Sequence, residues 1–189
     1  MEKRLVVAVT GASGSIYAVR FLENILEHYD RIYLTITENA STVIRTELGT
    51  DFPGSLINDK KVEILSQHDI TAPPSSGSVQ HDGMVIIPCS MGTAGRIASG
   101  ISNDLVTRAA DVCLKERRKL IMVVRETPLS LIHLRNLTAL TEAGATILPA
   151  APAFYNNPKT VEDLVSFVVA RVMQQLGLEQ VLLPEWERP

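Results

Sequence analysis

The sequence predicts an α/β fold in which helices cover both faces of one parallel sheet, a three-layer sandwich over residues 1–189. Short apolar, β-rich runs alternate with segments whose apolar residues have helical spacing, and this alternation is typical of parallel sheets. The chain has 189 residues, of which 46% are hydrophobic, so it can form the core of one domain of ordinary size. The sequence contains no internal repeat and no linker, and we therefore predict a single domain.

The individual elements follow in order from the N-terminus. The run LVVAVT at 5–10 predicts a buried strand, and the apolar spacing after it predicts a helix that reaches Tyr29. A T-x-x-D start signal, from Thr160 to Asp163, marks the beginning of the last helix. The remaining strands are predicted at 31–37, 84–89, 120–125 and 145–152, and the remaining helices near 39–48, 104–117, 130–143 and 161–175.

The stretch from 68 to 83, HDITAPPSSGSVQHDG, is the one long irregular segment of the sequence. A loop of this length in a compact domain is often functional. It is equally well interpreted as a mobile surface excursion, and the residues alone leave both interpretations open.

Hydroxyl groups, glycines and charged residues follow the predicted strands where each strand ends. In an open parallel sheet, ligands bind beyond the carboxyl ends of the strands. The arginine and glutamate directly after IMVV are not residues that a turn requires, which favours a binding site over ordinary polar turns. The residues delivered to this edge are Thr10, Gly11, Ala12, Ser13, Gly14, Thr37, Cys89, Ser90, Gly92, Thr93, Arg125, Glu126, Ala153, Phe154 and Tyr155.

Cations on two predicted helices add anion receptors to this edge. Arg108 and Lys115 are seven residues apart and therefore share a helix face. Arg171 follows Phe167 by four residues, which predicts that it lies on the apolar face of its helix with a fixed anionic partner. That partner is either a carboxylate of a neighbouring helix or a bound phosphate. Together with Arg125 and the glycine-rich turn, these cations favour two phosphate-bearing ligands, or one diphosphate.

Several classes of protein are excluded by composition. The net charge of −3 argues against general nucleic-acid binding. The N-terminus does not have the pattern of a signal peptide, and no run approaches the roughly 20 apolar residues of a membrane helix. The two cysteines, Cys89 and Cys113, and the four histidines lack the spacing of a disulfide framework or a metal site. We expect a cytoplasmic, disulfide-free protein that needs no metal.

These residues together resemble the UbiX-type flavin prenyltransferases, a family often labelled aromatic acid decarboxylases. The resemblance runs from Arg4 to about Trp186 and rests on the motifs TGASGSIY, APPSSGS, PCSMGT, LVTRAADVCLKERRKLIMVVRETPLS and LPAAPAFY. It implies a Rossmann-like or flavodoxin-like flavoprotein domain that binds FMN and dimethylallyl monophosphate. It also implies a homo-oligomer, a dodecamer in the family, whose product serves a UbiD-type decarboxylase partner.

The resemblance implies a role for each matching residue. In the family, the lysine that matches Lys115 comes from a neighbouring subunit, and Glu47 also reaches a shared site. Trp186 would shelter a prenyl cation with its π face. Residues implied to contact FMN are Gly11, Ala12, Ser13, Thr37, Ser90, Met91, Gly92, Thr93 and Arg125. Residues implied to bind the prenyl phosphate are Tyr155, Arg171, Arg108 and Lys115, and those implied in catalysis are Ser13, Glu126, Lys115 and Glu47.

The implied reaction joins a dimethylallyl group to reduced FMN. Flavin N5 attacks C1′ of the prenyl unit as phosphate leaves, and flavin C6 then bonds to C3′ to close a fourth ring. Concentrated cations would stabilise the leaving phosphate, and Ser13 and Glu126 would handle the proton released on ring closure. Three positions depart from the family pattern: Ile70 replaces a tryptophan found in some relatives, Thr37 the usual serine, and Glu38 a frequent lysine.

Two other functions compete with this interpretation. Flavin-dependent cysteine decarboxylases need a catalytic histidine soon after the second strand, and TENASTVIRTELG contains none. A non-catalytic FMN carrier would not require Lys115, Glu126, Tyr155 and Arg171 together. The pathway served, ubiquinone synthesis or aromatic acid breakdown, stays open.

Overall fold

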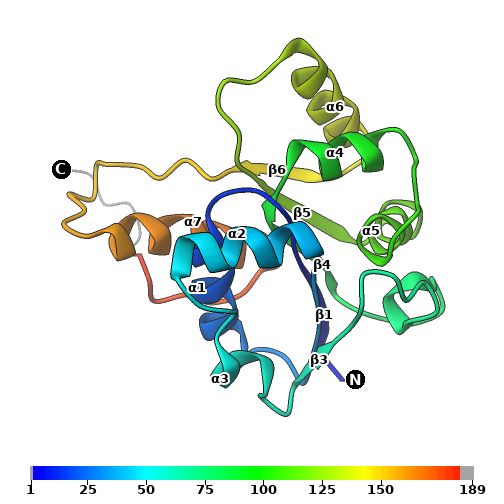
Figure 1. The fold of residues 1–189 in the computed structure, drawn as a ribbon, viewed down its shortest axis with the longest axis horizontal. Helices are drawn as coiled ribbons and strands as arrows, with labels where there is room; N and C mark the ends of the chain where they lie inside the picture. The colour runs from blue at the N-terminus through cyan, green and yellow to red at the C-terminus, as the bar shows by residue number, and fades with distance from the viewer. Residues whose placement is uncertain (1, 184–189) are drawn as a thin grey trace.

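Six parallel strands form the central sheet of the computed structural model, which describes residues 2–183 (Figure 1). Their order across the sheet is β3-β2-β1-β4-β5-β6, the strand order of the doubly wound Rossmann fold. Without the edge strand β3, the other five have the order of the flavodoxin-like fold, so both predicted descriptions apply. The strands are β1 (Arg4–Val9), β2 (Arg31–Ile36), β3 (Val62–Ile64), β4 (Gly83–Cys89), β5 (Lys119–Val124) and β6 (Thr146–Pro149).

Helices cover both faces of this sheet and make the predicted three layers. Helices α1, α2 and α7 pack with the short α3 against one face, and α4, α5 and α6 pack against the other. The helices are α1 (Ser15–Ile25), α2 (Glu38–Leu48), α3 (Gly54–Ile57), α4 (Met91–Ala98), α5 (Leu105–Lys115), α6 (Leu131–Glu142) and α7 (Val161–Leu176), and a 3₁₀ turn, η1, spans Pro73–Ser75.

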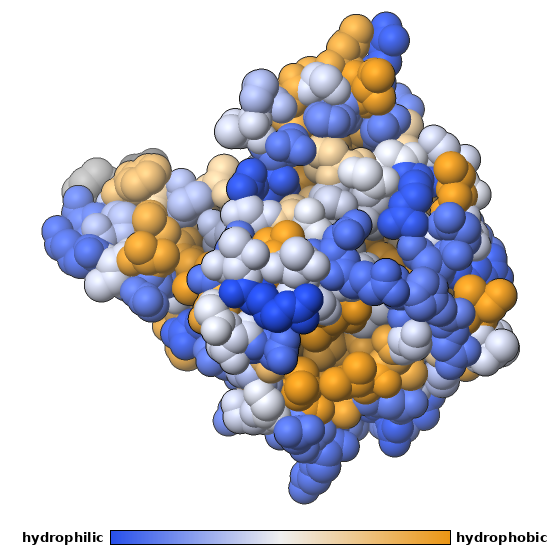
Figure 2. All heavy atoms as spheres, viewed as in Figure 1, coloured by the Kyte–Doolittle hydropathy of each residue, from blue (hydrophilic) through white to orange (hydrophobic). Residues whose placement is uncertain are grey.

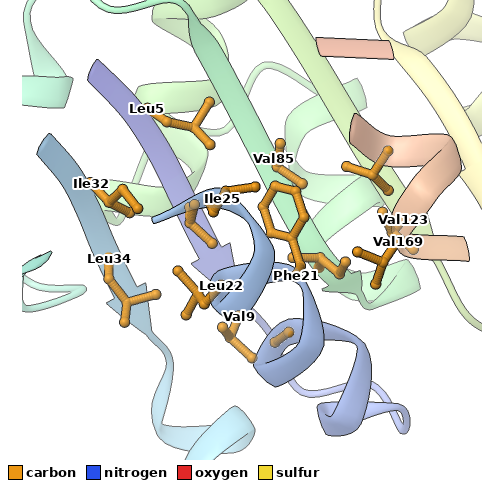
Figure 3. Close-up of a cluster of buried hydrophobic side chains, with 14 of the residues drawn as sticks. Leu5, Val9, Phe21, Leu22, Ile25, Ile32, Leu34, Val85, Val123 and Val169 are labelled. Atoms are coloured by element: carbon orange, nitrogen blue, oxygen red, sulfur yellow. The ribbon is translucent and has the colours of Figure 1, made fainter. Parts of the chain in front are cut away.

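The larger core lies between the sheet and the α1–α7 layer. Figure 3 shows Phe21 of α1 among Val85, Val123 and Val169, which come from β4, β5 and α7. The Phe21 side chain is fully buried. Truncating a buried phenylalanine to alanine costs about 3–5 kcal/mol, so this cluster holds α1 against the centre of the sheet. The glycine-rich turn that leads into α1 is therefore attached to a rigid element.

Successive strands are added to one side of β1 as far as β3 and to its other side from β4 onward, so the topological switch point lies between β1 and β4. The hydroxyl of Thr10, which follows β1, donates to the Pro88 carbonyl of β4 (2.9 Å) and accepts from the Ser90 N–H (2.9 Å). Thr10 is only 2% exposed. These two hydrogen bonds fix the ends of β1 and β4 where the segments that follow the two strands diverge.

All five predicted strands are present, but three elements were not predicted. The edge strand β3 has only three residues and α3 has four, so neither is long enough for its hydrophobic residues to show a strand or helix periodicity. Helix α4 has only eight residues, and after Met91 its first half consists of glycine, threonine and alanine residues, which carry little hydrophobic signal. Among the described residues, no helix is long and apolar enough to cross a membrane.

Candidate active site

Two clefts open at the carboxyl edge of the sheet, one on each side of the glycine-rich turn. The α4 cleft has a volume of about 410 Å³ and is lined by Gly11, Thr37, Glu38, Asn39, Gln67, Ser90, Gly92, Thr93, Arg96 and Asp104. The α7 cleft has a volume of about 500 Å³ and is lined by Ser13, Gly14, Ile16, Tyr17, Glu47, Leu48, Arg125, Ala150, Pro152, Val161, Leu164 and Val165. The turn thus presents Gly11 to the first cleft and Ser13 to the second.

Two helices begin at the α4 cleft. The Thr37 hydroxyl caps α2 by accepting from the Ala40 N–H (3.2 Å), and the Ser90 hydroxyl caps α4 by accepting from the Thr93 N–H (3.3 Å). Helix N-termini carry a partial positive charge and unpaired N–H groups, which favour anions. The α4 cleft is therefore suited to a phosphate group.

Arg96 is the only cation among the described residues that line the α4 cleft. Its guanidinium forms an ion pair with Asp104 and donates to Asn103 Oδ1 (3.1 Å) and Thr93 Oγ1 (3.4 Å). Burial raises the pKa of the Asp104 carboxyl, but hydrogen bonds from the Thr107 N–H and Arg96 outweigh it, so this pKa lies below its usual value. Arg96 is thus held in one place by a carboxylate that stays ionised.

The sequence analysis did not single out Arg96, Asp104, Asn39 or Gln67. Asp104 could have been found, because it precedes α5 by one residue and forms a capping box with Thr107. Arg96 carries no such signal, since its position depends on α4, which was itself not predicted.

Glu47 occupies the N-terminus of α1 at the α7 cleft. Its carboxylate accepts from the Gly14 N–H (3.0 and 3.1 Å to the two oxygens) and the Ser15 N–H (2.7 Å), and the Ser13 hydroxyl lies close enough to lower its pKa. Burial raises the Glu47 pKa, but the hydrogen bonds from Ser13 and Ser15 outweigh it and lower the pKa overall. The anion received at this helix start is thus a carboxylate of the same chain.

Arg125 and Glu126 follow β5 at the same edge. Arg125 is half-buried and lines the α7 cleft close to Tyr17, whose pKa is raised by burial and lowered to a lesser degree by the Arg125 charge. Glu126 is exposed, and its carboxylate accepts from the N–H of Thr127 (3.0 Å). The two side chains therefore have different surroundings, as expected for successive residues of an extended chain.

The segment 150–160 between β6 and α7 projects from the body of the molecule (Figure 1); Tyr155 belongs to this projecting segment, and Arg171 lies on α7, one turn after Phe167. The Tyr155 ring, 55% exposed, packs edge-on against Phe167 of α7 with ring centroids 6.1 Å apart. Arg171 is exposed, and its guanidinium donates to Gln174 Oε1 (2.6 Å). The prediction that Arg171 lies on the buried face of its helix was wrong, and its side-chain partner within this chain is the Gln174 amide, not a carboxylate. The buried stripe of α7 runs instead through residues such as Val165, Val169 and Met173, and the Leu164–Phe167–Arg171 row flanks it.

Arg108 and Lys115 lie on the far side of α5, against the loop that precedes β4. Arg108 Nε donates to the Ser75 carbonyl (3.0 Å) and Nη1 to Asp111 (2.7 Å), and Lys115 forms an ion pair with Glu116. Neither cation lines the α4 or the α7 cleft. Within one chain, the structure therefore separates these cations from Tyr155 and Arg171 and from the clefts.

Of the other predicted residues, Ala12 and Met91 are buried beside the lining of the clefts, and Trp186 lies outside the described residues. Among the described residues, no group of three or more histidine, cysteine, aspartate or glutamate side chains could hold a metal ion. Burial raises the pKa of the Cys89 thiol to about 12, so this cysteine at the end of β4 is a packed core residue.

Comparison with known proteins gives a consistent result. Residues 1–173 match the Flavoprotein family model. A flavin prenyltransferase UbiX from Thermoplasma acidophilum is 48% identical over 188 residues, which cover 97% of this chain and 99% of that protein. The crystal structure of AnUbiX in complex with FMN and dimethylallyl pyrophosphate has a TM-score of 0.93 at 40% identity, and the match covers 100% of this chain and 99% of that one. The crystal structure of a dodecameric FMN-dependent UbiX-like decarboxylase from Escherichia coli has a TM-score of 0.91 at 42% identity, and the match covers 98% of this chain and 100% of that one.

Proposed function

This chain belongs to the UbiX flavin prenyltransferase family, and on that premise we propose that it transfers a dimethylallyl group from dimethylallyl monophosphate to N5 and C6 of reduced FMN. The observation that carries the proposal is the Ser13–Glu47 pair at the start of α1. Glu47 is a fixed, ionised carboxylate whose hydroxyl partner, Ser13, faces the α7 cleft. Forming the second bond releases a proton from flavin C6, and this pair provides a route for it.

The α4 cleft fits the phosphate of FMN. The α1 N-terminus already holds Glu47, so the helix starts at Thr37 and Ser90 are the available anion receptors beside the glycine-rich turn. Arg96 would add the positive charge that a phosphate needs next to Asp104 and Glu38. Gly11, Ala12, Thr37, Ser90, Met91, Gly92 and Thr93 would hold the mononucleotide, which supplies the nucleophilic ring atoms when it is bound.

The α7 cleft fits the reacting end of the flavin and the prenyl chain. Its wall is largely apolar, with Ile16, Leu48 and Leu164, and so excludes water from a carbocation-like group. Arg125 is the cation at this wall and would bind FMN. Glu126, one residue later, would assist Ser13 and Glu47 in handling protons.

The residues proposed for the prenyl phosphate lie on separate surfaces of one chain, which supports a site shared between subunits. Tyr155 and Arg171 lie beside α7, whereas Arg108 and Lys115 lie on α5. We propose that assembly brings them together, with Lys115 contributed by a neighbouring subunit. Three cations and a hydroxyl would then stabilise the charge that develops on the departing phosphate.

Exposed apolar side chains support the assembly of a homo-oligomer. Ile132 of α6 is 69% exposed and Phe154 of the projecting segment is also 69% exposed. Figure 2 shows hydrophobic atoms over α6 at the top of the view and over the projecting segment at the left. Such apolar surfaces on a monomer mark sites of association. We propose a dodecamer, and a UbiD-type decarboxylase as the partner that consumes the prenylated flavin.

The direct test is anaerobic incubation of the protein with reduced FMN and dimethylallyl monophosphate, followed by mass spectrometry of the flavin. We expect a flavin heavier by one five-carbon unit. A parallel sample with dimethylallyl diphosphate tests the donor, and an adduct formed only there would replace the monophosphate in the proposal. Bound FMN without any adduct would identify an FMN carrier instead.

A further inference from the structure

Two arginines, one in the first turn of α5 and one just after its end, bind the loop that precedes β4. The Arg118 guanidinium donates to the Gly77 carbonyl (2.5 Å) and the Val79 carbonyl (2.7 Å). Arg108 Nε donates to the Ser75 carbonyl (3.0 Å), just upstream. Three backbone carbonyls within five residues are thus bound by side chains, and the loop has a defined position against α5. This arrangement favours the functional interpretation of the loop over the mobile one.

Gly77 lies directly against the Lys115–Glu116 ion pair. A β-carbon added at Gly77 would come closest to Glu116 Oε1, and would lie 2.9 Å from Glu116 Cδ and 2.9 Å from Lys115 Nζ. Unstrained contacts between heavy atoms of this kind lie at about 3.5–4.0 Å, so the side chains would have to move. The backbone of Gly77 is not in the left-handed region, and alanine could adopt its conformation. Alanine at this position would therefore displace the ends of the Lys115 and Glu116 side chains, which are free to move, while the backbone could stay in place.

We propose that Gly77 is a positioning residue for Lys115. The missing side chain leaves the volume in which the Lys115 ammonium lies, and Arg118 holds the Gly77 backbone at the correct distance. The inference rests on the proposed function, in which Lys115 binds the prenyl phosphate. It adds a prediction that the function alone does not make, namely that one methyl group on a neighbouring loop displaces a cation whose charge is unchanged.

The test compares Gly77→Ala with Gly54→Ala in the full chain. Gly54 is a matched control because an added β-carbon there would only approach Asn58 Nδ2, at 3.6 Å, an ordinary contact. For Gly77→Ala, we expect the KM for dimethylallyl monophosphate to rise about 10-fold or more, since misplacing a positioned group by 1 Å can cost up to about 100-fold. The Kd for FMN should be unchanged, and Gly54→Ala should behave as the parent protein.

A double-mutant cycle separates displacement of Lys115 from damage to the loop. If Gly77 acts through Lys115, then adding Gly77→Ala to Lys115→Ala should produce no further loss of activity. Additive losses, or an unchanged KM in Gly77→Ala, would overturn the proposal. Crystal structures of the parent and Gly77→Ala proteins give a readout that needs no activity, a shift of Lys115 Nζ by about 0.5–1 Å. If the parent protein forms no prenylated flavin, the proposed function fails, while these structures still decide whether Gly77 positions Lys115.

Discussion

The two clefts at the carboxyl edge differ in which groups occupy their helix N-termini and in how many charged side chains line them. In the α4 cleft, the helix starts are capped by hydroxyl groups, and the charged groups are Glu38 and an arginine paired with an aspartate. In the α7 cleft, the helix start is filled by the Glu47 carboxylate, and the remaining wall is largely apolar. A single glycine-rich turn separates the two clefts, so the helix starts on one side are open to an external anion, whereas the helix start on the other side is occupied by a carboxylate of the chain itself.

This difference shows that a helix N-terminus after a parallel strand is not by itself a phosphate site. Its capacity depends on what the rest of the chain places there. At α1 the chain supplies its own carboxylate, Glu47. The N–H groups that could bind an external anion instead hold this side chain, which we propose as a proton acceptor. The predictions below test this assignment, in order of decreasing expected effect.

Glu47→Gln should have the largest effect on activity. The substitution keeps the size of the side chain and part of its hydrogen bonding but removes the negative charge that accepts a proton through Ser13. We expect the rate of flavin prenylation in a single turnover to fall by about 100-fold or more, the usual contribution of a positioned general base. The Kd for FMN should change little. Glu142→Gln, an exposed carboxylate on α6, is the matched control. A normal rate in Glu47→Gln would show that Glu47 only caps α1.

Arg96→Gln should weaken FMN binding without weakening riboflavin binding. The substitution removes the cation of the α4 cleft and leaves the Asp104 carboxylate uncompensated. A hydrogen bond to a charged group contributes about 1.5–3 kcal/mol, so the Kd for FMN should rise about 10- to 100-fold. Fluorescence titration with each flavin measures the difference, and Arg135→Gln on α6 serves as the control. Equal weakening of both flavins would place the phosphate elsewhere.

Ser13→Ala should slow the reaction while FMN stays bound. The hydroxyl links Glu47 to the α7 cleft, and a water molecule could replace it in part, so we expect a loss of about 10-fold in single-turnover rate, near the lower limit for proton-transfer groups. Comparing this rate with the FMN Kd distinguishes the two possible roles. A large rise in Kd with a normal rate at saturating FMN would make Ser13 a binding contact only.

The pH dependence of stability should show the smallest effect. The folded-state pKa of Glu47 is lowered, so its carboxylate contributes stability above its unfolded pKa of about 4.3 and loses that contribution as the pH falls through the folded value. A carboxylate at a helix N-terminus contributes about 0.3–1 kcal/mol. Urea unfolding at pH 7 and pH 3 should therefore show that Glu47→Gln destabilises the protein at pH 7 and much less at pH 3. An equal difference at both values would contradict an ionised Glu47 in the native state.

The five long strands and the edge where polar residues gather could both be predicted from the sequence. Period and composition identify long buried strands, and parallel topology brings their carboxyl ends together. The partner of the α1 N-terminus could not be predicted, because Glu47 is 33 residues from Gly14 and reaches it only through the packing of α1 against α2. Arg171 shows a different failure. Its spacing from Phe167 correctly places the two residues in one row along α7. Helical spacing alone does not show whether that row is buried or lies at the edge of the buried stripe, as this one does.

Thr10 has a consequence for any attempt to redesign these clefts. Its hydroxyl both donates to Pro88 and accepts from Ser90, from a position with almost no contact with solvent. Valine would match its shape but leave the Ser90 N–H without its partner, and the Pro88 carbonyl would keep only the bond from the Thr10 backbone N–H (3.2 Å). Serine would keep the hydrogen bonds but leave a void. The floor beneath the two clefts is therefore intolerant of mutation, while the walls can vary. Variants selected for larger prenyl donors should accumulate changes around the rim and retain threonine at this position.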